Sequence, residues 1–253
     1  MSELHVESEH RVTPLELFFD LVFVFAFTEV TTLMTNDLSW AGLGRGLLVL
    51  AALWWAWTGY AWLTNSVDPE DRGYATVAML VAMAAMFVAA LAVPEAFDEH
   101  GVVFGIAFLI VRAMHLALYA ISAGDDRQLR AALARLTPPT MVAALLIVLA
   151  GFTEGAPRIL LWLLALTIDY LGPLVGRGVG WRVHPAHFAE RHGLIVIIAL
   201  GESFIAIGLG ANVGGLDAGV IVAAVLGLAV ATCFWLAYFD FFSIRGHQIL
   251  VDS

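Results

Sequence analysis

Apolar runs of about 20 residues follow one another along the whole chain, separated by short polar stretches, and this pattern restricts the fold more than any other feature. A helix of that length crosses the ~30 Å hydrocarbon core of a bilayer, and only helices and closed barrels keep their backbone groups paired in lipid. The runs lack the strict apolar/polar alternation of barrel strands. With 61% apolar residues, 13% charged residues and a mean hydropathy of +0.88, the sequence predicts an all-α, polytopic transmembrane helix bundle.

The runs predict eight spans in a single membrane-embedded domain over residues 13–242. A polar N-terminus at 1–12 precedes this domain and a tail at 243–253 follows it. The fifth span is the shortest, because the stretch "SAGDDRQLRAALARLTPP" before it has the composition of a loop. The tryptophans of "WWAW", Trp54 to Trp57, lie too deep for an interface belt and are expected to pack. The expected spans are 14–34, 41–63, 74–93, 101–123, 139–153, 158–176, 192–212 and 217–242.

The placement of arginines predicts the orientation, because cytoplasmic loops are enriched in basic residues. Eight spans put two arginines, Arg45 and Arg158, on one side, while Arg112 lies inside a span. Both termini are therefore predicted to be cytoplasmic in a multi-pass protein of the cell (inner) membrane. The other side holds nine arginines, namely Arg11, Arg72, Arg127, Arg130, Arg135, Arg177, Arg182, Arg191 and Arg245.

Several function classes are excluded by composition. All 12 basic residues are arginine, so a Schiff-base lysine and a phosphate loop ending in Gly-Lys-Ser/Thr are both excluded. The single cysteine, Cys233, cannot form a disulfide within one chain, and the net charge of -10 argues against nucleic acid. We expect no cofactor. The expected partners are membrane lipids and a small cation or a proton, and association of identical chains is left open.

Ionisable residues inside the spans are the strongest functional signal, since each is costly in lipid. Counting residues along the runs places Arg112, Asp169 and Glu202 near the midplane, with His115 and Asp20 nearer the cytoplasm. Five acids then face one arginine and one histidine, so the surplus acids must be protonated, reach water or bind a cation. The alternative is that Arg112 and one or two acids tie helices together while the other acids are neutral hydrogen-bond donors. The full set is Asp20, Glu29, Arg112, His115, Asp169, Glu202 and Asp240.

The first span contains three carboxylates with different expected roles. Thr13, Pro14 and Glu16 have the spacing of a capping box, so we interpret Glu16 mainly as part of a helix cap. Asp20 has no such explanation, and we expect it to meet His115. Glu29 is nine residues beyond Asp20 and therefore faces the opposite side of the helix, toward another contact or the outer mouth.

The stretch "HPAHFAERHG" before the seventh span offers His184, His187, Glu190 and His192 as metal ligands. No pair of them has the i, i+4 spacing of ligands on one helix face, so we expect no metal. We favour instead an interfacial segment that is salt-bridged through Glu190 and Arg191. In "GESFIAIGLG", Gly201 and its neighbouring small residues would let another helix or a ligand approach Glu202.

Two long segments, "RVTPLELFFDLVFVFAFTEVT" from Arg11 and "HFAERHGLIVIIALGESFIAIG" from His187, resemble the signature segments of the bacterial low temperature requirement protein A family. The tract "WWAWTGYAWLTN" with the following "DPEDR" is similar to that family's second span and loop. The resemblance implies a polytopic cell-membrane protein and assigns no molecular activity. Members of the family are usually longer, so we expect this chain to be a short or truncated form. The positions carried over by motif are Glu16, Phe19, Asp20, Glu29, His187, Glu190, Arg191, Gly201 and Glu202.

The sequence favours a proton- or cation-coupled transporter or channel-like protein rather than an enzyme. In this hypothesis Asp20 and Glu202 titrate or bind the ion, Arg112 is the central counter-charge, His115 relays protons and Asp169 supports them. An intramembrane enzyme that modifies lipids, and a non-catalytic membrane scaffold in cold adaptation, are the alternatives.

Overall fold

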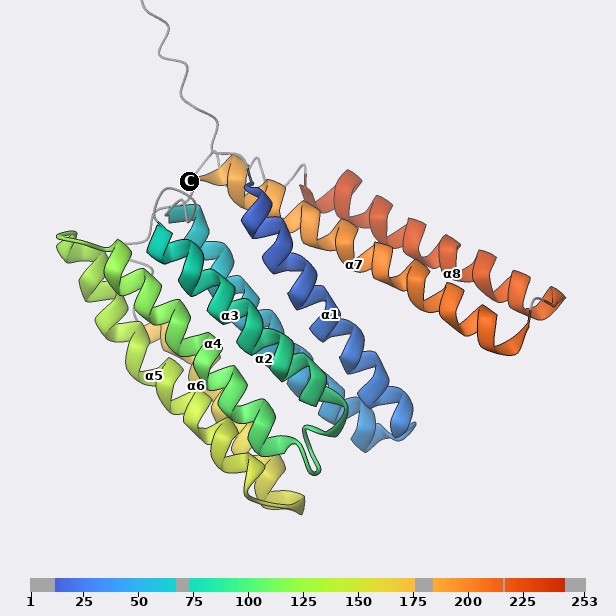
Figure 1. Cartoon of the computed structure of the whole chain (residues 1–253), viewed down its shortest axis with the longest axis horizontal. Coiled ribbons are helices and arrows are strands. Elements are labelled where there is room, and N and C mark those ends of the chain that lie inside the picture. Colours follow the sequence, from blue (N-terminus) through green and yellow to red (C-terminus); the bar gives the residue numbers. More distant parts are fainter. Residues whose placement is uncertain (1–11, 67–72, 176–183, 216, 244–253) are drawn as a thin grey trace, which may run out of the picture. The chain divides into compact units, whose positions relative to one another are not determined.

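The computed structural model describes residues 12–66, 73–175, 184–215 and 217–243, and in these residues the chain forms eight long helices (Figure 1). Each is long and apolar enough to cross a membrane, which confirms the predicted all-α bundle with eight spans. The helices are α1 (Pro14–Asn36), α2 (Trp40–Ser66), α3 (Gly73–Ala92), α4 (Gly101–Ser122), α5 (Arg127–Gly151), α6 (Gly155–Val175), α7 (Pro185–Gly214) and α8 (Ala218–Leu236), with short helical turns η1 (Val93–Glu95) after α3 and η2 (Ala237–Ser243) after α8.

The fifth helix is longer than the sequence predicted, and it begins at Arg127 rather than near residue 139. Asp126 starts it as the N-cap, because its Oδ1 accepts hydrogen bonds from the amides of Gln128 at 2.9 Å and Leu129 at 3.1 Å. Pro138 and Pro139 lie inside this helix, although proline lacks an amide donor. Residues 127–139 of the polar stretch assigned to a loop are therefore the first half of α5.

The seventh helix also begins earlier than predicted, at Pro185 instead of residue 192. Proline suits the first turn of a helix, since the amide that it lacks would have no partner there. The histidines expected in an interfacial segment therefore belong to the first turns of α7, apart from His184, which is its N-cap residue.

The chain divides into two compact units, one formed by residues 1–17 with 183–253 and the other by residues 18–182. In the second unit α3, α4, α5 and α6 pack as successive neighbours, and α2 packs on α4 and α6. Gly105 and Gly151 allow α4 and α5 to approach closely, because a Cβ at either position would meet backbone of the other helix. Aromatic contacts attach α1 to α2 and α3, including Phe19 with Tyr60 at 4.5 Å between ring centroids.

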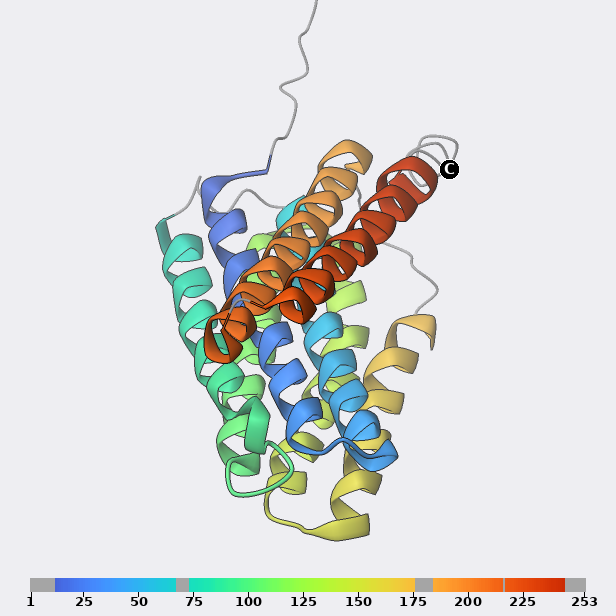
Figure 2. The same cartoon turned by 90° about the vertical axis from the view of Figure 1, so that its right-hand side faces the viewer.

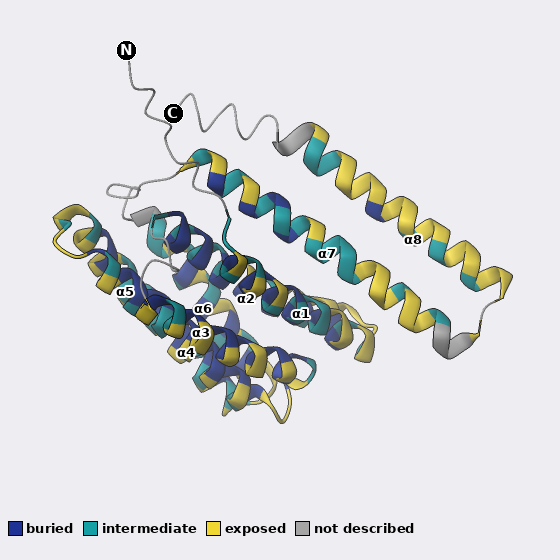
Figure 3. Cartoon of the chain, turned by 45° about the horizontal axis from the view of Figure 1, so that its top comes forward, coloured by how far each residue is buried: buried dark blue, intermediate teal, exposed yellow. Residues whose placement is uncertain are grey.

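In the other unit, α7 and α8 lie side by side and η2 continues α8 (Figure 2). Few of their residues are buried: only 6% of the most apolar window is buried in each of the last two spans, against 22–56% in the first six (Figure 3). Most of the buried side chains of the described chain therefore belong to the unit formed by residues 18–182.

The predicted orientation of the termini stays a prediction. Five of the nine arginines behind it, Arg11, Arg72, Arg177, Arg182 and Arg245, lie outside the described residues. One of the other four, Arg191, is fully buried in α7 rather than placed in a loop.

Candidate functional site

Arg112 of α4 and Asp169 of α6 form a buried ion pair in the unit formed by residues 18–182. Nη2 of Arg112 lies 2.9 Å from Oδ1 and 3.0 Å from Oδ2 of Asp169. Thr140 of α5 bridges the pair, since its hydroxyl accepts from the same Nη2 at 3.4 Å and donates to Oδ1 at 3.2 Å. The expected pairing of Arg112 with Asp169 is present, and it joins three helices.

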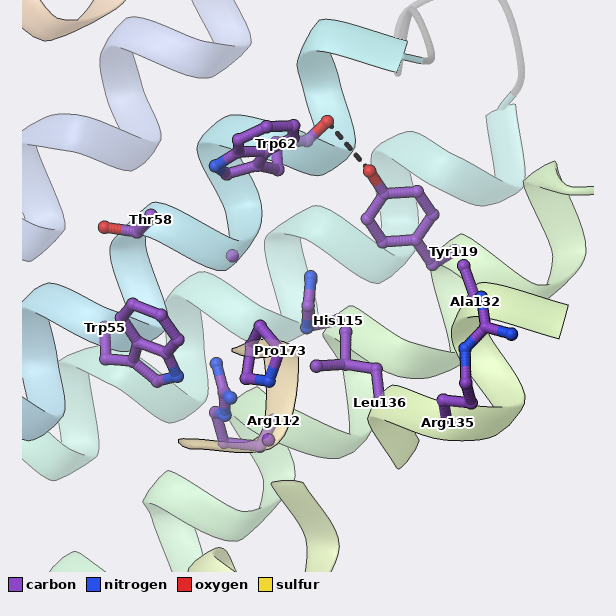
Figure 4. Close-up of a pocket in the computed structure, with 12 residues that line it drawn as sticks. Trp55, Thr58, Trp62, Arg112, His115, Tyr119, Ala132, Arg135, Leu136 and Pro173 are labelled. Carbon is purple, nitrogen blue, oxygen red and sulfur yellow. Dashed lines mark hydrogen bonds between the residues drawn. The ribbon is translucent and has the colours of Figure 1, made fainter. Parts of the chain in front are cut away.

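A partly open cavity of about 280 Å³ lies beside this ion pair, and it is lined by residues of α2, α4, α5 and α6 (Figure 4). Its titratable lining residues are Arg112, His115, Tyr119 and Arg135, and its other aromatic ones are Trp55 and Trp62. Arg112 therefore lies between Asp169 on one side and the cavity on the other. The sequence did not predict Arg135 as a site residue, because it was counted only as a loop arginine.

Hydrogen bonds and ring stacking join the helices that form the walls of the cavity. The hydroxyl of Tyr119 donates to the carbonyl oxygen of Trp62 at 3.0 Å, which joins α4 to α2 (Figure 4). Trp55 stacks on Tyr170 of α6 with ring centroids 4.2 Å apart, and the hydroxyl of Tyr170 donates to the carbonyl of Ala51. The ring of Trp55 is thus placed by its contact with α6, whereas Trp62 meets α4 through its backbone carbonyl.

His115 lies in the middle of the lining side chains (Figure 4). It is only 2% exposed, and its ring nitrogens make no hydrogen bond of standard geometry among the described residues, although the backbone of Gly59 lies close enough to act as a weak partner. Gly59 makes room for the ring, since a Cβ there would lie 3.0 Å from Cε1 of His115 and 3.3 Å from Nη1 of Arg112. Nε of Arg112 also lacks a partner in the described part of the chain. Unsatisfied buried polar atoms are uncommon, so this group calls for an explanation.

The predicted contact between Asp20 and His115 is wrong. Oδ1 of Asp20 accepts a hydrogen bond of 2.8 Å from Nε1 of Trp57, and both residues are fully buried. Trp57 was expected only to pack. A buried indole N–H needs a hydrogen-bond acceptor. This requirement was the feature of the sequence that could have indicated a polar partner for Trp57.

Glu16 is the centre of a second buried cluster, which belongs to the unit formed by residues 1–17 and 183–253. It completes the predicted capping box: its Oε2 accepts from the amide of Thr13 at 2.9 Å, and its own amide donates to Oγ1 of Thr13 at 3.3 Å. In addition, Oε1 accepts from Nη1 of Arg191 at 2.8 Å, and Nε2 of His187 lies 3.2 Å from Oε2. Of the two residues through which salt bridges were expected, Arg191 forms one with Glu16, and Glu190 accepts from the amide of Val12 at 3.4 Å.

The predicted surplus of acids inside the spans stays a prediction. Glu29 and Glu202 are half-exposed and Asp240 is exposed in the described chain. Glu202 and its neighbour Gly201 belong to α7, which lies in the other unit from Arg112. The position of a residue along an apolar stretch indicates only its depth in the membrane. Its burial depends on which helices cover that face of its own helix. The three buried carboxylates, Glu16, Asp20 and Asp169, each have a donor.

Comparison with known proteins assigns the family. The model of the bacterial low temperature requirement A protein (LtrA) matches residues 11–252. The chain belongs to the LtrA family. Among curated proteins, "Uncharacterized protein RA0937" of Rhizobium meliloti (strain 1021) is 34% identical over 206 residues, which are 76% of this chain and 49% of the relative. The chain therefore spans about half the length of the curated relative that it matches. No solved structure matches it.

Within this LtrA-family chain, the two segments that carry the family resemblance meet at the Glu16 cluster. Glu16 comes from the first segment, and His187 and Arg191 come from the second. The cavity lies outside these two segments, but Trp55, Thr58, Gly59 and Trp62 of its lining belong to the tract at 54–65 that also resembles the family. With its eight apolar helices and its family, the chain is a multi-pass membrane protein.

Proposed function

We propose that this chain is a proton-coupled transporter of the inner membrane that holds its solute in the cavity of the unit formed by residues 18–182. The observation that carries the proposal is the double role of Arg112, which pairs with Asp169 through Nη2 and also lines the cavity. Ionisable residues inside spans commonly mark solute and proton pathways.

The ion pair supplies a physical basis for coupling. Breaking a buried pair by neutralising one partner costs about 3–5 kcal/mol, because the other charge is left uncompensated. Protonation of Asp169 therefore becomes favourable when a solute in the cavity offers Arg112 another acceptor. In this scheme proton binding at Asp169 and solute binding at Arg112 stabilise each other, and Thr140 positions both side chains.

The structure favours a proton over a metal cation as the coupling ion. The described residues contain no group of three His, Cys, Asp or Glu side chains that could hold a metal ion. Each of the three buried carboxylates is already engaged by a donor, namely Arg191, Trp57 or Arg112. A metal ion would have to displace these donors, whereas a proton only has to neutralise the carboxylate.

The experiment uses the purified full chain in proteoliposomes that contain a trapped pH-sensitive dye. A panel of small carboxylates, amines, sugars and amino acids is added with and without an imposed pH gradient. At least one solute should accelerate the change of internal pH, and Asp169→Asn should abolish this acceleration. Asp125→Asn, which changes an exposed acid outside the cavity, is the matched control and should behave like the original chain.

Thr140→Val serves as a second variant, because it removes the bridging hydroxyl and keeps both charges. It should slow the solute-dependent proton movement without abolishing it. If no solute moves protons in a folded sample, or if Asp169→Asn transports as well as the original chain, the proposal is wrong.

A further inference from the structure

We infer that the cavity binds an organic monoanion with a flat apolar body, of the kind represented by an aromatic carboxylate. The inference names the solute class of the transporter proposed above and rests on that proposal. It is carried by the chemistry of the lining, which combines hydrogen-bond donors, positive charge and aromatic walls.

The donors of the lining lack acceptors. Arginine carries only donors, and Nε of Arg112 has no partner among the described residues. The ring of His115 is 2% exposed, and the backbone of Gly59 is close enough to be a weak partner of only one of its two nitrogens. A ligand oxygen beside Nε of Arg112 would satisfy that donor, and it would also accept from His115 in the tautomer whose N–H points away from Gly59. A carboxylate offers such oxygens and adds charge.

The charge of the lining selects against cations. Arg112 and Arg135 line the cavity together with His115, and none of the twelve described lining residues is a carboxylate. An ammonium group or a metal ion would meet like charges there. The pairing of Arg112 with Asp169 limits the positive charge available to a ligand, which favours one negative charge over two.

The shape of the cavity favours a ring. Trp55, Trp62 and Tyr119 present aromatic surfaces, and Trp55 is fixed by its stacking on Tyr170. The volume of about 280 Å³ equals roughly the liquid volume of nine water molecules. A single-ring molecule fits this space, whereas a whole phospholipid does not. The half-buried and exposed residues Leu136 and Arg135 border the same cavity, so the ligand's path to it runs along α5.

The test compares three probes of matched size by equilibrium binding to the full chain in phosphatidylcholine nanodiscs. Phenylacetate is the anion, phenylacetamide the neutral analogue and phenethylamine the cation. Phenylacetate should bind at least ten-fold more tightly than the amide, and the amine should not compete with it. Equal or tighter binding of the amide or the amine would overturn the inference.

A variant pair assigns binding to this cavity. Arg135→Gln changes an exposed lining residue and should weaken phenylacetate binding roughly ten-fold. Arg130→Gln removes an exposed charge from the same helix outside the lining and should leave binding unchanged. An equal loss of phenylacetate affinity in both variants would mean that only surface charge attracts the probe. Unchanged affinity in Arg135→Gln would mean that the anion binds outside this cavity.

Nanodiscs with phosphatidylglycerol distinguish a free anion from a lipid. If the anionic lipid displaces phenylacetate, the monoanion chemistry holds and its source is the headgroup; if it does not, the source is soluble. The binding result is also separate from the transport result. Anion binding without proton movement would support the anion site and contradict the proposed transport function. Proton movement driven only by sugars or amines would support transport and contradict the anion site.

Discussion

At the scale of single residues, Glu16 shows which contacts a sequence can reveal. Its role in a capping box follows from spacing alone, because Thr13 and Glu16 are three residues apart. Its ion pair with Arg191 joins positions 175 residues apart, and no local pattern encodes that distance. The same holds for Asp20, because its hydrogen-bond donor Trp57 was predicted only to pack. Contacts between residues distant in sequence require the fold itself.

We predict that Glu16→Gln destabilises the chain much more than loss of the cap does. Glutamine preserves the capping geometry, but it removes the carboxylate that forms the ion pair with Arg191, at a cost of about 3–5 kcal/mol in the free energy of unfolding. Thr13→Ala removes only the cap and should cost about 1 kcal/mol. Thermal unfolding in one detergent compares the two variants. Similar losses in both would show that the ion pair contributes nothing beyond the cap.

At the scale of helices, the sequence predicted the existence of every span and missed where two of them begin. α2, α3 and α4 lie close to the expected ranges, because their ends coincide with polar turns. The first half of α5 and the first turns of α7 were wrong for a common reason. Prolines and polar residues were read as loop signals, although an N-cap at Asp126 and a proline at the start of α7 permit helix there.

The packing of α4 on α5 leads to a prediction about Gly105. A Cβ at this position would lie 2.7 Å from Cα and 3.0 Å from the amide nitrogen of Val148, and backbone cannot rotate away as a side chain can. Gly105→Ala should therefore push the helices apart and lower the midpoint of thermal unfolding. Gly44→Ala is the control, because its Cβ would meet nothing within 4 Å and alanine favours helix by about 1 kcal/mol. A Gly105→Ala chain as stable as this control would show that the two helices are not closely packed.

At the scale of the whole chain, composition gave the right class of protein, but the count of charges inside the spans was incomplete. The count of five acids against one arginine omitted Arg191, because that residue was placed in a loop. With Arg191 buried beside Glu16, each of the three buried carboxylates of the described chain has a donor. Among the side chains that line the cavity, the buried atoms without a partner in the described chain are nitrogens of His115 and Arg112, and this favours an anionic ligand there over the expected cation.

The orientation predicted from arginines determines the side from which a solute approaches Arg135. Arg135 lies eight residues into α5, about 12 Å along the helix from the turn that contains Asp125. In a chain whose Cys233 is replaced by serine, single cysteines at Asp125 and Glu99 mark opposite ends of α4, and both positions are exposed. A membrane-impermeant maleimide added to intact cells should label the Glu99→Cys chain and leave Asp125→Cys unlabelled until the cells are opened. The reverse pattern would invert the topology and place Arg135 nearer the outer face, so that the solute would reach the cavity from outside.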